Sequence, residues 1–179
     1  MTEKTSALSV QKIAILGAES SGKSQLAEAL AHHYQTVWVP EYLREFVEKN
    51  GRVPQESDQL HIAQVQLQQE QHLLDKAHRW LFCDTTPLMT ALYSRFYFKQ
   101  VDAELLGLEQ AHDYALTLVT APDFPWIADG LQRESPEVRQ RIHDNLVDTL
   151  DARGIPFVLV EGSLQQRLEQ VKFTLDFLS

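Results

Sequence analysis

GAESSGKS, residues 17–24, has the spacing of a loop that holds phosphate groups, and it sets the fold class of the whole 179-residue chain. The glycines let the backbone turn sharply around an anion, and the helix that follows presents its N-terminus to the same anion. We expect Lys23 to reach the β- and γ-phosphates of a nucleotide and Ser24 to offer its hydroxyl to Mg²⁺. The residues expected to bind ATP are Gly17, Ala18, Glu19, Ser20, Ser21, Gly22, Lys23, Ser24 and Gln25.

Short apolar runs alternate with helical patterns along the rest of the chain. Strands are predicted at 12–17, 36–40, 80–84, 114–120 and 156–162. Helices are predicted at 23–33, 41–50, 58–77, 87–99, 101–112, 137–153 and 164–178. Strands separated by helices in this way form parallel sheets that are covered on both faces. The prediction is therefore an α/β fold: a three-layer P-loop NTPase of the nucleoside- and nucleotide-kinase kind, with a five-stranded parallel sheet and a lid segment.

The same pattern predicts the domain organisation. A single P-loop kinase domain is expected over residues 10–179, after a loose tail at 1–9, with the lid at about 121–136. The long helix at 58–77 is expected to bury one face, because apolar residues recur along it at helical spacing. The residues expected on that face are Leu60, Ala63, Leu67 and Leu74.

Composition excludes several classes of function. The net charge is −9, and a chain this acidic is poorly suited to neutralising the phosphates of nucleic acid. The N-terminus has no apolar signal core, and no apolar run is long enough to span a membrane. The single cysteine, Cys83, allows no disulfide within the chain and is expected to be buried. We expect a cytoplasmic protein without nucleic-acid or membrane partners, and the sequence leaves its oligomeric state open.

Two carboxylates are predicted beside the phosphate loop, because ligands bind beyond the carboxyl ends of parallel strands. Asp84 ends the strand at 80–84, where it can hold Mg²⁺ directly or through water. The alternative for Asp84 is a cap at the start of the next helix. Glu41 follows the strand at 36–40, where it can accept a proton from an attacking hydroxyl. The alternative for Glu41 is an acidic first-turn residue favoured by the helix dipole.

The irregular segment 121–136, rich in proline, is predicted to close over the cleft. Trp126 offers a flat ring for stacking, and Asp129 can accept hydrogen bonds from sugar hydroxyls. Arg133 can offset the charge of the phosphoryl group in transfer. The alternative is a surface loop with Trp126 packed against its base. Arg44, outside this segment, either contacts phosphate or orients the carboxylate of residue 41, or else forms a surface ion pair.

The destination of the terminal phosphate follows from what the chain contains. It has no Asn-Lys-x-Asp segment, which a signalling GTPase needs to read its base. The third predicted strand ends in Asp84-Thr85, whereas a motor ATPase usually has Asp-Glu at this point. A small-molecule kinase needs a carboxylate after the second strand, a pocket wall and a lid that excludes water. The chain has a candidate for each of these parts, so transfer to a small molecule is favoured over hydrolysis.

Six segments resemble the nicotinamide riboside kinase domain of the NadR family and its stand-alone relatives. They are GAESSGKS, VPEYLRE, HIAQVQ, LFCDTTPL, PWIADGLQR and GIPFVLVEG, and the resemblance extends from about residue 10 to residue 178. The phosphate loop is shared with many kinases, whereas the E-Y-x-R-E and P-W-x-x-D-G segments are more specific. The resemblance implies ATP-dependent phosphorylation of the 5′-hydroxyl of nicotinamide riboside, which gives nicotinamide mononucleotide for NAD biosynthesis.

Together, the motifs and the resemblance assign roles to individual residues. The catalytic candidates are Lys23, Glu41, Asp84 and Arg133, and the metal ligands are Ser24 and Asp84, with ATP and Mg²⁺ as cofactors. The candidates for binding the nucleoside are Glu41, Tyr42, Arg44, Gln66, Trp126 and Asp129. The chain departs from the family pattern at Thr86, where members often have Asp, and at Gln132-Arg133. Two alternatives therefore stay open: a kinase for another nucleoside, and a regulatory module that senses ATP and a NAD precursor.

Overall fold

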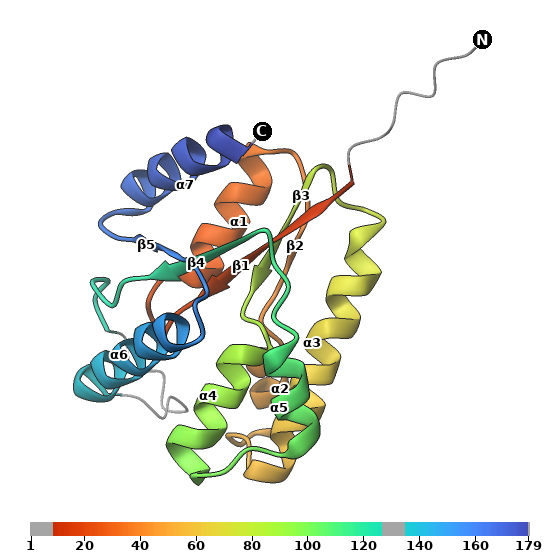
Figure 1. Cartoon of the computed structure of the whole chain (residues 1–179), viewed down its shortest axis with the longest axis vertical. Helices are drawn as coiled ribbons and strands as arrows, with labels where there is room; N and C mark the ends of the chain where they lie inside the picture. Colours follow the sequence, from red (N-terminus) through yellow and green to blue (C-terminus); the bar gives the residue numbers. More distant parts are fainter. Residues whose placement is uncertain (1–8, 127–134, 179) are drawn as a thin grey trace.

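The computed structural model describes residues 9–126 and 135–178. Its strands are β1 (Gln11–Leu16), β2 (Trp38–Val39), β3 (Trp80–Asp84), β4 (Leu116–Thr120) and β5 (Val158–Val160). They form one parallel sheet in the order β2-β3-β1-β4-β5 (Figure 1). The predicted α/β fold with a five-stranded parallel sheet is confirmed. Because all the strands run the same way, their carboxyl ends share one edge, where ligands of such sheets bind.

Helices cover both faces of this sheet. The described residues contain α1 (Lys23–His33), α2 (Tyr42–Asn50), η1 (Glu56–Asp58), α3 (Gln59–Leu74), α4 (Pro87–Phe98), α5 (Ala103–Gln110), α6 (Pro136–Ala152) and α7 (Leu164–Leu178). Helices α1 and α7 pack on one face, and α3, α4 and α6 pack on the other, giving three layers (Figure 1). Across the described residues, none of these helices combines the length and apolar character needed to cross a bilayer.

The edge strands are shorter than predicted, because their flanking residues use their polar groups elsewhere. The strand predicted at 36–40 begins only at residue 38, since the Thr36 N–H donates to the Ala31 carbonyl at the end of α1 (2.9 Å). The strand predicted at 156–162 spans residues 158–160. Pro156 has no N–H to pair, and the Gly162 N–H donates to the Asp123 carboxylate (2.7 Å). Each edge therefore keeps only the residues that pair with its neighbouring strand.

The buried face of α3 differs from the prediction. Ala63 is buried as expected, but the three leucines predicted with it are only half-buried. The residues that α3 buries most deeply are Gln59, Ile62, Ala63, Gln66 and Glu70. The apolar pattern missed this face because two of its polar members, Gln66 and Glu70, have hydrogen-bond partners in the folded protein, which satisfy groups that burial would otherwise disfavour.

Glu70 belongs to a buried polar cluster beneath the sheet on the α3 side. Its carboxylate accepts hydrogen bonds from Lys12 Nζ (3.2 Å) and the Tyr114 hydroxyl (2.6 Å), and burial raises its pKa. Next to it, His112 Nε2 lies 3.0 Å from the Thr117 hydroxyl. Burial, with the positive charges of Arg153 and Lys12, lowers the pKa of His112 to about 4, against a smaller opposing effect of Asp113. This histidine is therefore neutral at physiological pH.

Candidate functional site

The phosphate loop connects β1 to α1 at the carboxyl edge of the sheet, where the sequence predicted it. Gly22 is the N-cap of α1 with φ 87°, a conformation that favours glycine. Gly17 has no room for a side chain, because a Cβ there would lie 2.2 Å from the Thr120 hydroxyl oxygen. The Ser21 hydroxyl donates to the Ala18 carbonyl (2.6 Å) and lies 2.7 Å from the same Thr120 oxygen. The loop is therefore held closed by side chains as well as by its own backbone.

Lys23 lies inside this loop. Its side chain is buried, with 6 % of the residue exposed, and Nζ donates to the Ala18 carbonyl (3.0 Å). The Lys23 side chain thus reaches from the start of α1 back to Ala18, near the beginning of the phosphate loop. A buried cation with one neutral partner has donors left for the oxygens of a phosphate group.

Ser24 and Asp84 meet as the metal assignment requires. Ser24 Oγ donates to Asp84 Oδ2 (2.6 Å), and Asp84 is fully buried. Asp84 Oδ1 is buried without a hydrogen-bond partner among the described residues, so this oxygen is available to a ligand. The described residues contain no group of three His, Cys, Asp or Glu that could hold a metal by themselves. One carboxylate with a hydroxyl suits Mg²⁺, whose other ligands are commonly phosphate oxygens and water.

The electrostatics of Asp84 reflect its neighbours. The pKa of this carboxyl is raised to about 6, first by burial and second by the negative charge of Glu41. The charge of Lys23, the hydrogen bond from Ser24 and the charge of Arg44 oppose the rise, in that order of size. A divalent cation in contact with this carboxylate would offset the unfavourable burial of its charge.

The alternative role of Asp84 as a helix cap is wrong. Helix α4 begins at Pro87, and its N-cap is Thr86. Thr85 lies between Asp84 and this N-cap, and its backbone φ of 77° is a strained conformation for a β-branched residue. The Thr85 N–H donates to the Ile15 carbonyl (3.0 Å). This turn separates Asp84 from the helix and leaves its carboxylate to face Ser24.

Glu41 faces the phosphate loop across a cavity of about 670 Å³. It is the N-cap of α2, where its side chain makes no capping hydrogen bond, so this position does not occupy the carboxylate. Arg44 lines the same cavity, is exposed, and makes no ion pair among the described residues. Both residues also line a second hollow of about 440 Å³ between α2 and α3. Glu41 and Arg44 thus form the wall between two spaces, one of which contains the phosphate loop.

Gln66 holds the backbone on either side of Glu41. Its Oε1 accepts from the Tyr42 N–H (2.8 Å), and its Nε2 donates to the carbonyls of Pro40 (3.1 Å) and Asp84 (3.3 Å). The side chain is buried, with 2 % of the residue exposed. One amide therefore ties both predicted carboxylates to α3. This gives Gln66 a positioning role that the sequence did not indicate, beside the substrate contact predicted for it.

The structure places the remaining candidates only in part. Tyr42 is half-buried, and its ring packs edge-on against the His61 ring with centroids 6.1 Å apart. Trp126 is half-buried, and its Nε1 is buried without a hydrogen-bond partner among the described residues. Asp129 and Arg133 lie outside the described residues, as does half of the predicted lid, residues 127–134. Their roles stay predictions.

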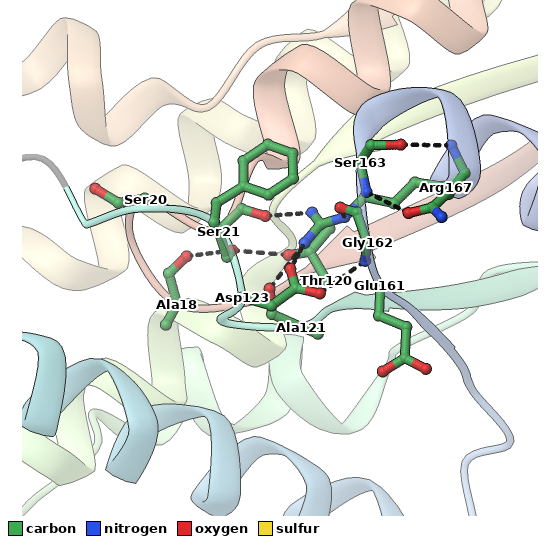
Figure 2. Close-up of polar contacts among 12 residues, drawn as sticks. Ala18, Ser20, Ser21, Thr120, Ala121, Asp123, Glu161, Gly162, Ser163 and Arg167 are labelled. Carbon is green, nitrogen blue, oxygen red and sulfur yellow. Dashed lines mark hydrogen bonds and ion pairs between the residues drawn. The ribbon is translucent and has the colours of Figure 1, made fainter.

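Two arginines that the sequence did not single out donate hydrogen bonds to backbone carbonyls of the phosphate loop, one from α6 and one from α7. Arg139 on α6 donates to the Ser20 carbonyl (3.1 Å) and the Phe124 carbonyl (2.8 Å). Arg167 on α7 donates to the Ser21 carbonyl (Figure 2). Arg167 lies four and eight residues before Val171 and Leu175, with which it shares the buried face of α7. An arginine on an apolar face is the signal that would have found it.

Comparisons with known proteins identify the family of this chain. The family of AAA domains matches over residues 12–167. The trifunctional NAD biosynthesis/regulator protein NadR of Escherichia coli K12 is 31% identical over 157 residues, which are 85% of this chain and 38% of that protein. NadR of Salmonella typhimurium LT2 gives the same identity and coverage. The chain thus spans about two fifths of the length of these relatives. The resemblance to NadR that the motifs indicated is confirmed.

Solved structures show the same fold. A NadR protein in complex with NR superposes with a TM-score of 0.81 at 21% identity, over 94% of this chain and 51% of that one. Deoxyadenosine kinase from M. mycoides has a TM-score of 0.64 at 13% identity, over 92% of this chain and 98% of the kinase. Thymidylate kinase from Candida albicans has a TM-score of 0.67 at 15% identity, over 94% and 92%. The predicted P-loop kinase fold is therefore confirmed.

Proposed function

The chain belongs to the AAA domain family, and we propose that it is an ATP-dependent kinase that phosphorylates the 5′-hydroxyl of nicotinamide riboside. The product is nicotinamide mononucleotide, so the reaction belongs to NAD salvage. The observation that carries the proposal is the phosphate loop facing Glu41 across one cavity, with Asp84 bonded to Ser24 beneath it. The acceptor is inferred from the similarity to NadR, one structure of which contains NR.

On the donor side, the phosphate loop binds the triphosphate of ATP. Its backbone N–H groups and the start of α1 attract the anion, and Lys23 offsets charge on the terminal phosphates. Ser24 and the free oxygen of Asp84 are the groups that would hold Mg²⁺, which neutralises phosphate charge when bound. A second NadR structure, in complex with NAD and AMP-PNP, supports binding of an ATP-like ligand by this fold.

On the acceptor side, Glu41 takes the proton of the ribose hydroxyl as the phosphoryl group moves in line. Gln66 fixes the backbone on both sides of Glu41, which keeps the carboxylate in place for this transfer. Tyr42, Arg44 and Trp126 complete the nucleoside pocket. Asp129 and Arg133 act from the lid, where they contact the sugar and the phosphoryl group and exclude water.

Nicotinamide riboside and ATP are the proposed small-molecule partners. The acidic composition argues against nucleic-acid binding, and we expect the protein to act in the cytoplasm without membrane attachment. Transfer to a nucleoside is favoured over hydrolysis, because a carboxylate faces the loop while Asp84 is followed by a threonine rather than a glutamate.

The decisive experiment measures ADP release from ATP and Mg²⁺ by the purified protein with nicotinamide riboside, with other nucleosides, and with no acceptor. Release that requires nicotinamide riboside supports the proposal. Release with a different nucleoside only would replace the acceptor and keep the kinase. ATP binding without release under any condition would favour the sensing module.

A matched pair of variants tests the base. Glu41→Gln should lower kcat about 100-fold or more while ATP binding is retained, since general-base catalysis typically contributes this much. Glu45→Gln, on the same helix, removes a carboxylate that pairs with Lys49 at the surface (2.6 Å), and it should leave kcat nearly unchanged. Equal effects of the two changes would show that Glu41 is not the base.

A further inference from the structure

Arg167 is the largest fully buried side chain in the part of the chain that the structure describes, although it carries a positive charge. Taking a guanidinium out of water is unfavourable unless its donors are used and its charge is balanced. Burial lowers the pKa of Arg167, while the carboxylate of Asp123 opposes this change. The contacts of this side chain must therefore use its donors and balance its charge.

The donors of Arg167 reach three loops at the carboxyl edge of the sheet (Figure 2). Nη1 donates to the Ser21 carbonyl of the phosphate loop. Nη2 donates to the Ala121 carbonyl (3.0 Å), just after β4, and to the Asp123 carboxylate. Nε donates to the Gly162 carbonyl (3.1 Å), between β5 and α7. One guanidinium thus joins the ends of β1, β4 and β5.

Asp123 and Phe124 hold the guanidinium in place. Asp123 accepts from both Arg167 and the Gly162 N–H, so the acid belongs to the same network. The Phe124 ring lies 4.0 Å from the Arg167 carbon Cζ. The same ring lies against the phosphate loop, since a Cβ on Gly22 would be 2.5 Å from it. Arg167 Nη1 would lie 3.0 Å from the same Cβ, so Arg167, Phe124 and Gly22 pack against one another.

The bond to Ser21 has a consequence for the neighbouring N–H. In a trans peptide the carbonyl and the N–H of the next residue point in opposite directions. Because the Ser21 carbonyl faces Arg167, the Gly22 N–H points away from α7. Gly22 and its loop neighbours line the cavity that faces Glu41. Arg139 does the same for the preceding peptide, because its guanidinium donates to the Ser20 carbonyl (3.1 Å).

We propose that Arg167 is a positioning residue for nucleotide binding, which turns the Ser21–Gly22 peptide so that its N–H faces the phosphates. Its charge adds to the attraction for the polyphosphate from behind the loop, and Asp123, whose side chain is 40% exposed, screens that charge only in part. The inference rests on the nucleotide-binding half of the proposed function and is independent of the acceptor. Asp123 and Phe124 link the same arginine to the first residues of the predicted lid segment.

The test compares ATP–Mg²⁺ affinity by calorimetry, without acceptor, for the wild type, Arg167→Met and Arg167→Lys. Arg167→Met should raise the Kd about tenfold or more, because hydrogen bonds to charged donors are among the strongest in proteins. Arg167→Lys keeps the charge and is the variant to use if methionine prevents folding. It should also weaken binding, by a smaller factor, because an ammonium cannot span the same carbonyls.

The control is Arg153→Met, which removes another guanidinium that donates to backbone carbonyls, those of Glu109 (3.0 Å) and Gln110 (3.4 Å) at the end of α5. It should leave the ATP Kd unchanged. A general loss of structure would weaken ATP and the acceptor nucleoside alike, so equal loss of both affinities in Arg167→Lys would overturn the proposal. Unchanged ATP affinity in both Arg167 variants would overturn it too. Failure of the wild type to bind ATP would instead refute the proposed function.

Discussion

Replacing Asp84 with Asn is expected to raise stability and remove activity in a single change. Asp84 is fully buried, and burial together with the charge of Glu41 raises its pKa from 3.8 to about 6. At neutral pH the folded protein therefore carries a carboxylate whose charge is disfavoured. Asn has nearly the same shape and can still accept the hydrogen bond from Ser24, but it has no charge to bury.

The magnitude follows from the pKa difference between the folded and unfolded states. A rise from 3.8 to about 6 corresponds to about 3 kcal/mol, at about 1.4 kcal/mol for each pKa unit. The new amide N–H takes the place of Oδ1, which has no partner among the described residues, and an unpaired buried donor costs about 1 kcal/mol or more. We expect Asp84→Asn to raise the free energy of unfolding by about 1 to 2 kcal/mol near pH 7.

The pH dependence of the stability difference between Asp84→Asn and the wild type identifies the buried charge as its cause. Because the pKa of Asp84 is raised on folding, the folded wild type binds a proton that the unfolded chain does not bind between pH 6 and pH 4. The wild type therefore gains stability as the pH falls through this range, and the advantage of Asp84→Asn shrinks. By about pH 5 the difference should be smaller by about 1 kcal/mol.

The assay is urea unfolding in EDTA without nucleotide, paired with kinetics in ATP and Mg²⁺. Asp148→Asn, a change at an exposed position on α6, is the control and should alter stability by no more than about 0.5 kcal/mol. Asp84→Asn should lower kcat/KM about 100- to 1000-fold, as loss of one preorganised charge contact commonly does. A variant less stable than the wild type near pH 7, or a difference that does not shrink on acidification, would show that the buried charge of Asp84 does not destabilise the fold.

The parts of the site that lie within one continuous motif could be predicted from the sequence. The phosphate loop requires a strand before it and a helix after it, and β1 and α1 supply both, with α1 bounded as predicted. Ser24 and Asp84 lie far apart in the chain, but Asp84 ends β3 and Ser24 lies just after the loop that follows β1, and parallel strands bring their carboxyl ends together. The 2.6 Å contact between them is what this argument expects. Local sequence pattern and strand order were enough to predict these two features, because both features depend on the course of the backbone.

The contacts that support this site could not be predicted, since they join side chains to backbone groups that only the complete fold brings together. Gln66 reaches the carbonyls of Pro40 and Asp84, which belong to different segments. Arg167 reaches three loops whose proximity depends on the order of the strands. A polar residue on an apolar helix face indicates that such a partner exists. The sequence does not say which carbonyl it is.

The buried face of α3 was mispredicted for the same reason. Hydrophobic periodicity places leucines inward, and it assumes that a polar residue is more stable in water. Glu70 escapes this rule because Lys12 and Tyr114 satisfy its carboxylate. Gln66 escapes it because all its hydrogen-bonding groups have backbone partners. The helix is rotated toward these contacts, so its leucines are left half-buried.

Three further changes test separate parts of the structure. Gly17→Ala should destabilise the protein by about 1 to 3 kcal/mol and abolish ATP binding, whereas Gly107→Ala, where a Cβ meets nothing within 4 Å, should leave binding intact. Gln66→Leu should lower kcat more than ATP affinity; loss of both to the same extent would make its role purely structural. His112→Gln addresses acid stability. The pKa of His112 is lowered to about 4 on folding, so its contribution is present above the unfolded value near 6.5 and is lost as the pH falls toward 4. The wild type should therefore lose about 2 kcal/mol more than His112→Gln between about pH 7 and pH 4, after allowance for partial exposure. Glu70, whose raised pKa acts with the opposite sign, is present in both proteins, so their difference in urea unfolding isolates the histidine, and equal losses would contradict the assignment.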